Sequence, residues 1–270
     1  MKIKLFIVSL FIIISIVDLP VLAQRSDITV AVAANVQYAM KDLKAKFEKE
    51  TGIKTNVIIG SSGQLTAQIQ QGAPYDIFIS ADMKYPKVLY NNGKAAGFPK
   101  VYAYGSLVIW TLKKGISFGD DYQELLKDNI HKIALANPRT APYGVATIEA
   151  IKYFKIYSQI ADKLVYGESI SPTNQYIVTK AAEVGFTAKS VVLSPVMLGK
   201  GTWKEIPPEA YQPIKQGCVI LSYGFNHHRK EAQLFYKFLF SGEAMKILEN
   251  YGYKIPDVTK NRDLGENRNK

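Results

Sequence analysis

Residues 28–63 decide the fold, and they read ITVAVAANVQYAMKDLKAKFEKETGIKTNVIIGSSG. The segment opens with residues 28–33, which are all apolar or β-branched, as expected of a buried strand. Apolar residues then recur at steps of four, three and four, at Val36, Met40, Leu43 and Phe47. This spacing predicts a helix with one buried face. A second strand, 53–59, runs into a loop of glycine and serine.

Local signals mark the boundaries of the first helix and introduce two further elements. Asn35 stands directly before the helix, in the place of an N-cap, and Gly52 follows it as a stop. A short helix from Gln64 ends at Gly72, and a third strand covers residues 76–80. Strand and helix therefore alternate, which predicts a parallel sheet covered by helices, as in α/β proteins.

The same alternation recurs in the second half of the chain. We expect strands at 132–136 and 184–188, with a helix over 143–153 between them. A strand over 218–223 then precedes an amphipathic helix, whose apolar residues include Leu234, Phe238 and Met245. These elements predict two α/β lobes, with the C-terminal segment returning to the first.

The first 23 residues have the pattern of a secretory signal peptide. Lys2 and Lys4 give a positive start, residues 5–17 form an apolar run broken only by two serines, and a small-residue site ends at Ala23. A membrane anchor is the alternative, but this run of 13 residues falls short of the roughly 20 that span a bilayer. We therefore expect cleavage near Ala23 and a periplasmic mature protein.

Composition favours an ordinary globular protein. The chain has 270 residues, of which 47% are hydrophobic and 21% charged, enough for two modest domains. Its formal net charge of +11 would suit a nucleic-acid or membrane-surface partner, but its lysines alternate with acidic residues, as on a solvated surface. Cys218 is the only cysteine, so stability depends on core packing without an internal disulfide. We expect no nucleic-acid partner.

One structural device occurs four times: a strand, a loop of small or hydroxyl residues, and the start of a helix. The loops are residues 33–35, 60–63, 142–144 and 168–171. A helix N-terminus offers unpaired N–H groups and a partial positive charge, so it binds anions without a basic side chain. Taken alone, Asn35 or Ser62 would simply cap its own helix. Four such loops at strand ends, two in each lobe, favour one shared anion site in the crevice between the lobes.

These loops carry almost no charge, which bears on the kind of anion. Arg139 and Glu168 are the exceptions. Neutral N–H and hydroxyl donors suit a fully deprotonated dianion, whereas hydrogenphosphate carries a proton that needs an acceptor. The loops therefore predict a dianion that carries no proton.

Other chemistries find weaker support in the sequence. Asp76 and Asp82 flank an apolar strand with no histidine nearby, which favours capping or hinge contacts over a metal site. His227 and His228 are adjacent and lack a third ligand at metal spacing, so we expect both to face solvent. A secreted serine hydrolase using Ser62 would need a base and a Gly-x-Ser-x-Gly turn, and the loop has neither. We expect a binding protein with neither enzymatic activity nor a cofactor.

Several motifs carry a family resemblance. They are AAN at 33–35, GSSGQL at 60–65, GAPYDIFISAD at 72–82, PYG at 142–144, GESIS at 167–171, EVGF at 183–186 and YGY at 251–253. In these motifs the chain resembles periplasmic molybdate-binding proteins, over nearly all of its mature length. The run at 72–82 is specific at its position, whereas the serine loop alone is not.

The resemblance implies a two-lobed type II periplasmic-binding-protein fold. Each lobe would be a mixed, mostly parallel sheet flanked by helices, with the ligand in the cleft between them. We expect the first lobe to comprise residues 24–107 and 217–258, the second to comprise 108–216, and a polar tail to cover 259–270. The implied function is capture of molybdate or tungstate by a monomer and delivery to the membrane permease of an ABC importer. Another tetrahedral oxyanion, such as sulfate, is the alternative ligand.

The resemblance also implies, position by position, four ligand-binding residues. Asn35 and Ser62 would bind from the first lobe through side chain and backbone N–H, and Tyr143 and Ile170 would donate backbone N–H groups from the second. All four would contact the oxygens of the oxyanion and not its metal atom. Two departures bear on selectivity, because many members have serine in place of Asn35 and some have tyrosine in place of Ala188.

Overall fold

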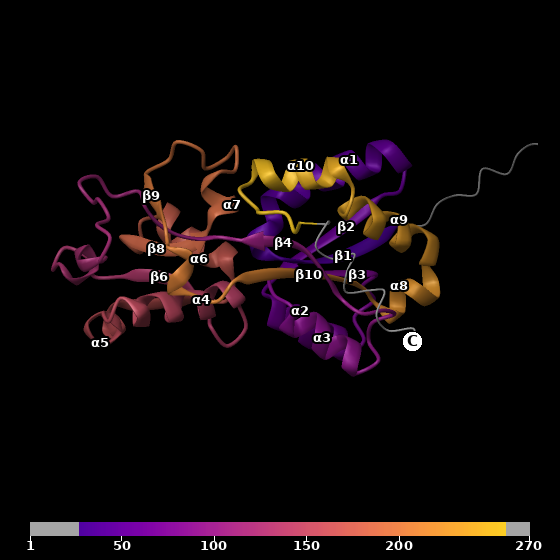
Figure 1. Cartoon of the computed structure of the whole chain (residues 1–270), viewed down its shortest axis with the longest axis horizontal. Helices are drawn as coiled ribbons and strands as arrows, with labels where there is room; N and C mark the ends of the chain where they lie inside the picture. The colour runs from indigo at the N-terminus through magenta and orange to yellow at the C-terminus, as the bar shows by residue number, and fades with distance from the viewer. Residues whose placement is uncertain (1–26, 258–270) are drawn as a thin grey trace, which may run out of the picture.

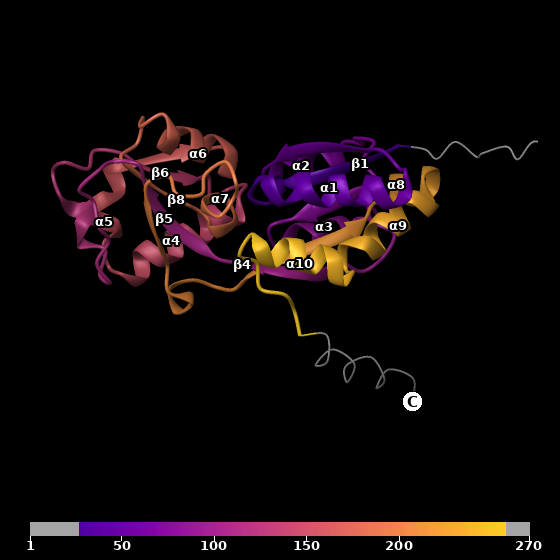
Figure 2. The same cartoon turned by 90° about the horizontal axis from the view of Figure 1, so that it is seen from above.

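The structure is a computed structural model, and it describes residues 27–257. Two five-stranded sheets, each covered by helices, lie side by side along the long axis and form two lobes (Figures 1 and 2). The α/β class and the mixed sheets flanked by helices are thereby confirmed. The expected signal peptide at 1–23 and polar tail at 259–270 lie outside the described residues.

The first lobe is built on a sheet with the strand order β2-β1-β3-β10-β4. Its strands are β1 Ile28–Ala33, β2 Thr55–Gly60, β3 Ile77–Ser80, β4 Lys100–Gly105 and β10 Ile214–Ile220. β1 pairs in parallel with β2 and β3, whereas β10 runs antiparallel to β3 and β4. The carboxyl ends of β1, β2 and β3 therefore meet at one edge of the sheet, where α/β proteins bind ligands.

Helices cover both faces of this sheet. They are η1 Ala34–Val36, α1 Gln37–Thr51, α2 Ser62–Gln70, α3 Lys84–Asn91, α8 Ser222–His227, α9 Arg229–Leu239 and α10 Gly242–Asn250. Side chains alternate across β1, so Val30 and Val32 pack with α1, α9 and α10 while Ala31 packs with α2 and α3. The C-terminal helices thus complete a core that begins with the first strand, as the ribbons of Figure 1 show.

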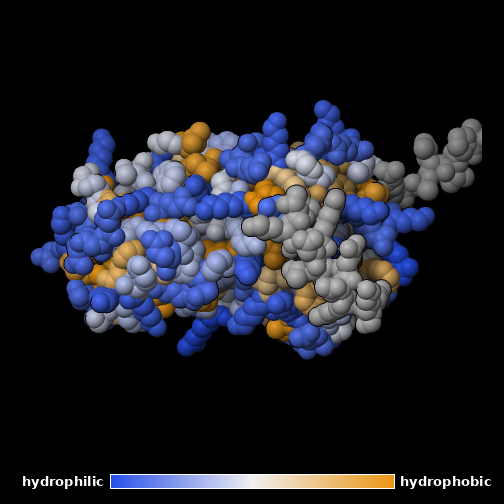
Figure 3. Space-filling view, in the orientation of Figure 1, coloured by the Kyte–Doolittle hydropathy of each residue, from blue (hydrophilic) through white to orange (hydrophobic). Residues whose placement is uncertain are grey.

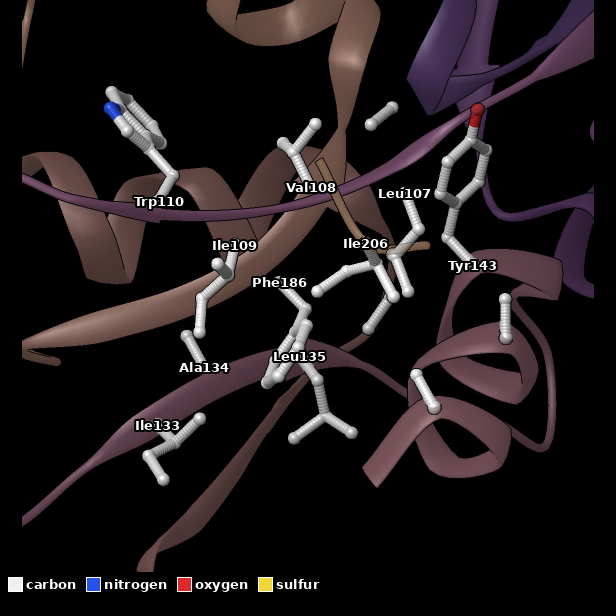
Figure 4. Packing of buried hydrophobic residues seen from close by; sticks show 14 of the residues in the cluster. Leu107, Val108, Ile109, Trp110, Ile133, Ala134, Leu135, Tyr143, Phe186 and Ile206 are labelled. Atoms are coloured by element: carbon white, nitrogen blue, oxygen red, sulfur yellow. The ribbon is translucent and has the colours of Figure 1, made fainter. Parts of the chain in front are cut away.

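The second lobe repeats this arrangement with the strand order β7-β6-β8-β5-β9. Its strands are β5 Leu107–Thr111, β6 Ile133–Ala136, β7 Leu164–Gly167, β8 Val184–Ala188 and β9 Thr202–Glu205. Its helices are η2 Gln123–Leu126, α4 Pro142–Tyr153, α5 Tyr157–Ile160, η3 Ala161–Lys163, α6 Ile170–Val178, α7 Lys189–Val192 and η4 Pro208–Ala210. β6 is parallel to β7 and β8, and β5 is antiparallel to β8 and β9. Figure 4 shows the buried side chains that this sheet and α4 contribute to one core.

The chain crosses between the sheets twice. β4 ends at Gly105 and β5 begins two residues later, and the return path enters the first sheet at β10. A Cβ atom at Gly105 would collide with the hydroxyl of Tyr143 and the amide of Gln216. Only glycine therefore permits these two side chains to meet behind the crossing strand.

The local signals of the sequence were only partly right. Gly52 ends α1 in the left-handed conformation at φ 71°, as expected. The N-cap prediction for Asn35 is wrong, because Asn35 lies within η1 and Val36 precedes α1 without a side-chain cap. The single C-terminal amphipathic helix is also wrong, because Ser241 caps α10 through the Ala244 N–H and separates it from α9.

The acidic pair flanking β3 has structural partners. Asp76 accepts the Thr29 N–H at 2.6 Å and contacts Nδ1 of His228 at 2.8 Å, so it joins β1, β3 and the α8–α9 segment. The expectation that His228 faces solvent is therefore wrong, although His227 is exposed and stacks on Tyr223. Asp82 accepts the Tyr85 N–H at 3.2 Å at the start of α3. Among residues 27–257 no group of His, Cys, Asp and Glu has the arrangement of a metal site.

Removal of the Phe47 side chain tests the packing of the first lobe. Phe47 is fully buried, and its ring lies 4.9 Å from that of Phe235 and 5.5 Å from that of Phe238. We expect Phe47→Ala to lower the free energy of unfolding by about 3–5 kcal/mol in a urea titration. Phe98→Ala is the control, because Phe98 is 61% exposed and its loss should cost less than about 1 kcal/mol. Equal losses in the two variants would contradict this packing.

Candidate ligand-binding site

A cavity lies between the lobes, where the carboxyl ends of parallel strands from both sheets face each other. Its lining consists of Ala33, Ala34, Asn35, Ser61, Ser62, Ala81, Ala141, Pro142, Tyr143, Ser169 and Ile170. The four residues predicted from the sequence, Asn35, Ser62, Tyr143 and Ile170, thus lie around one space. That space is small: the volume open to the centre of a water-sized sphere is about 10 Å³, room for about one water molecule, so the cavity suits a small ion and not a drug-sized molecule.

On the first lobe, the start of α2 is set by a capping box. The Ser61 hydroxyl accepts the Gln64 N–H, and the Gln64 side chain accepts the Ser61 N–H, both at 3.3 Å. The helix therefore begins at Ser62, two residues earlier than the sequence suggested. No acceptor for the Ser62 N–H is found among residues 27–257, so this group remains available at the cavity.

The hydroxyl of Ser62 is oriented by one hydrogen bond and can donate another. Its oxygen accepts the Ala81 N–H at 3.0 Å, from the residue that follows β3. No protein acceptor for its hydrogen is present in the described part of the chain, and the residue is 1% exposed. One side chain therefore offers both an N–H and an O–H to the same space.

On the second lobe, α4 and α6 begin at the cavity. Pro142 is the first residue of α4 and has no N–H, so the N–H of Tyr143 is the first donor of that helix. Ile170 is the first residue of α6 and follows Ser169. Neither the Tyr143 nor the Ile170 N–H has a hydrogen-bond acceptor within the span that the structure describes. Three helix N-termini thus direct free N–H groups into one cavity.

The side chain of Asn35 points into a buried polar network. Its side-chain nitrogen donates to the side-chain oxygen Oε1 of Gln216 and to the Tyr253 hydroxyl, each at 2.9 Å. Its backbone carbonyl accepts the Ser190 hydroxyl at 2.7 Å and the Tyr253 hydroxyl at 3.0 Å. Both side-chain hydrogens of Asn35 are therefore engaged by protein, whereas its backbone N–H has no acceptor within the described residues.

Gln216, Tyr253 and Ser190 are residues that sequence reasoning missed. Gln216 is fully buried beside a bulge in β10, where it also contacts the hydroxyls of Tyr102 at 3.3 Å and Tyr143 at 3.4 Å. Burial raises the pKa of the Tyr102 and Tyr143 hydroxyls well above the ordinary value, so both stay protonated. The motif at 251–253 was the only sequence signal that pointed toward this network.

Tyr143 connects the network to the cavity. In Figure 4 its hydroxyl points away from the other labelled side chains of the second lobe and toward the ribbon of the first. Its backbone N–H lies at the cavity, and its hydroxyl contacts Gln216 of the first sheet. Gly144 follows, and its close approach to Ala136 and Pro138 leaves no room for a Cβ atom. The start of α4 is therefore held tightly at the end of β6.

Within residues 27–257, no charged side chain lines the cavity. Arg139 and Glu168, the charged residues of the sequence loops, are both exposed, and Glu168 accepts the Gln64 amide at 3.1 Å. Hydrophilic side chains cover both lobes on the face shown in Figure 3, with hydrophobic residues in small separate patches. The net positive charge thus belongs to the solvated surface and not to the cavity.

Comparison with known proteins places this geometry in a family. The family described as bacterial extracellular solute-binding protein matches residues 28–254. This chain belongs to that family. The molybdate-binding protein ModA of Azotobacter vinelandii is 38% identical to it over 235 residues, which cover 86% of this chain and 92% of the relative.

Two further relatives of this solute-binding protein agree with that assignment. ModA of Rhodobacter capsulatus is also 38% identical, over 86% of this chain and 89% of the relative. The solved structure of the periplasmic molybdate-binding protein of Azotobacter vinelandii superposes with a TM-score of 0.81 at 30% identity, covering 86% of this chain and all of that one. The family resemblance seen in the sequence motifs is confirmed.

The cavity of this solute-binding protein offers no support for hydrolysis. The Ser62 oxygen accepts a backbone N–H from Ala81 and contacts no histidine. The ring of His228 contacts Asp76 at the opposite end of β3. Ser62 therefore lacks the base that would activate it as a nucleophile.

Replacement of Tyr253 by phenylalanine tests the network. The change removes the partner of the Asn35 amide and of the Ser190 hydroxyl while leaving the ring in place. We expect Tyr253→Phe to lower the free energy of unfolding by about 1–3 kcal/mol, because buried polar groups lose their partners. Thermal unfolding of the variant measures this loss. Tyr90→Phe, at a 41% exposed position, is the control, and its free energy of unfolding should change little. A stability unchanged by Tyr253→Phe would contradict the network.

Proposed function

We propose that this protein captures molybdate or tungstate between its two lobes and delivers the oxyanion to the membrane permease of an ABC importer. The observation that carries the proposal is the uncharged cavity at which three helix N-termini and the Ser62 hydroxyl meet. The names of the relatives, which are molybdate-binding proteins, support the choice of ligand. Binding without catalysis fits both observations.

The donors account for binding of a dianion. Asn35, Ser62, Tyr143 and Ile170 line the cavity, and we assign their backbone N–H groups and the Ser62 hydroxyl as the donors to the anion. A hydrogen bond to a charged group contributes about 1.5–3 kcal/mol, so five of them contribute roughly 7.5–15 kcal/mol before ordering costs, a range that includes the roughly 12 kcal/mol of a nanomolar complex. Donors come from both lobes, and neither set surrounds an anion alone. Binding should therefore favour the closed arrangement of the lobes.

The same donor set supports selectivity against phosphate. No carboxylate lines the cavity, so the proton of hydrogenphosphate would have no charged acceptor there. Sulfate carries no proton near neutral pH, so only the size of the cavity separates it from molybdate. Molybdate and tungstate are too alike in size for this cavity to rank them.

The remaining parts of the proposal concern organisation and location. We propose a monomer with its first lobe at residues 24–107 and 217–258 and its second at 108–216, except that Leu107 begins β5 of the second sheet and residues 214–216 begin β10 of the first. The relative of known structure is a periplasmic protein, which supports export with cleavage near Ala23. Within residues 27–257 no helix combines the length and apolar character needed to cross a membrane.

Titration of the mature protein with four anions tests the ligand. Isothermal calorimetry should show tight binding of molybdate and tungstate, weaker binding of sulfate, and no binding of phosphate. Affinity should change little between low and high salt, because the anion is enclosed by neutral donors, whereas a surface nucleic-acid site would weaken steeply. Tight binding of sulfate with none of molybdate would overturn the ligand assignment. No heat with any of the four anions would overturn the site.

Ser62→Ala tests the hydroxyl as a ligand donor. The variant keeps the backbone N–H and loses the hydroxyl, which also accepts the Ala81 N–H, and the binding free energy for molybdate should weaken by about 1.5–3 kcal/mol with the loss of the O–H donor. Ser222→Ala is the matched control, because Ser222 follows the end of β10 that pairs with the start of β3, at the far edge of the sheet. Calorimetric titration of both variants with molybdate measures the two affinities. An affinity that Ser62→Ala leaves unchanged would place the anion elsewhere.

A further inference from the structure

Contacts between the lobes occur beside the cavity as well as at the network. On the first lobe, the Gly63 N–H donates to the carbonyl of Thr140 at 2.9 Å. The Tyr85 hydroxyl donates to the carbonyl of Arg139 at 3.2 Å. We call these two hydrogen bonds the mouth contact. Neither Gly63 nor Tyr85 lines the cavity.

The second-lobe side of the mouth contact is a braced turn. The Asn137 side chain accepts the Arg139 N–H at 3.0 Å, and the Asn137 carbonyl accepts the N–H groups of Thr140 at 3.1 Å and Ala141 at 2.8 Å. The turn leads directly into Pro142 and Tyr143 at the start of α4. The positions of the Arg139 and Thr140 carbonyls therefore influence the position of the Tyr143 N–H.

On the first-lobe side of the mouth contact, no space remains for a side chain at Gly63. A Cβ atom at Gly63 would lie 2.8 Å from the Tyr85 hydroxyl and 3.0 Å from both the Cα and the carbonyl oxygen of Thr140. Gly63 is the second residue of α2, next to Ser62, and its φ is not in the left-handed region. Glycine is therefore needed at this position for the approach of the lobes and not for the helix itself, which alanine would favour.

The Tyr85 hydroxyl is suited to a lasting donor role. Burial, and to a lesser extent the nearby Asp82 carboxylate, raises the pKa of Tyr85, so the hydroxyl stays protonated at neutral pH. Tyr85 itself is half-buried at the start of α3, where the Asp82 carboxylate accepts its N–H.

We infer that Gly63 and Tyr85 are positioning residues, which hold the turn at 137–141 so that the Tyr143 N–H faces Ser62 across the cavity and the bound anion is released slowly. This inference rests on the proposed function, because it assigns a role in retaining the same ligand. The mouth contact forms only when the lobes are together. Its loss should therefore speed release of the anion without slowing its entry.

The test measures release of ⁹⁹Mo-labelled molybdate from the full mature protein after dilution into excess unlabelled molybdate. Tyr85→Phe removes one hydrogen bond and should speed release about two- to tenfold, with the association rate unchanged. Gly63→Ala should speed release at least as much, because its methyl group keeps Thr140 from closing on α2. The ligand-free form of Gly63→Ala should melt no lower than the wild type, since alanine favours the helix.

Tyr75→Phe is the matched control. The Tyr75 hydroxyl donates to the Gln68 side chain at 3.0 Å, so this variant loses a comparable exposed hydrogen bond that lies wholly within the first lobe. Its release rate should equal that of the wild type. Wild-type release rates in both Tyr85→Phe and Gly63→Ala would overturn the inference and leave the proposed function intact. A wild-type protein that retains no molybdate would instead contradict the proposed function itself.

Discussion

A helix cannot satisfy its first backbone N–H groups, and the arrangement of this protein follows from where those groups are placed. α2, α4 and α6 begin at the carboxyl ends of parallel strands from two separate sheets, and their first N–H groups meet at one cavity. A buried anion needs such fixed donors, because transfer of a charge out of water is costly unless hydrogen bonds replace its hydration. The two lobes supply these donors from opposite sides, so the cavity is complete only when the lobes are together.

The buried network beside the cavity holds this arrangement together. Asn35 and Gln216 use their amides to join η1, β4, β10, α4 and the C-terminal segment, and nearly every polar group has a partner. Tyr143 belongs to both systems, since its N–H faces the cavity while its hydroxyl reaches Gln216. A change in the position of α4 therefore alters the cavity and the network at once, which ties occupancy of the cavity to the relative position of the lobes.

Two of the sequence predictions failed because a distant partner competed for a polar side chain, whereas the left-handed end of α1 was predicted correctly from a local signal. Gly52 ends α1 as expected, because a left-handed residue depends only on the local backbone. Asn35 was taken for a helix cap, but Gln216 and Tyr253 engage its side chain instead. His228 was expected in solvent, but a buried Asp76 lies 152 residues away in sequence and 2.8 Å away in space. The errors at Asn35 and His228 thus arose at polar side chains whose partners are remote in the chain, whereas the starts of α2 and α10 were missed at local caps, Ser61 and Ser241.

The sequence by itself determined the α/β alternation and the glycine and serine loops, and its family resemblance supplied the four candidate residues. Periodicity and loop chemistry involve only residues close together in the chain, so they can be recognised from the sequence alone. Only the tertiary structure decided that the Asn35 side-chain amide donates to Gln216 and Tyr253, which lie 181 and 218 residues away in the sequence. Hydrogen bonds over such separations depend on how the two sheets pack, and no local pattern encodes that packing.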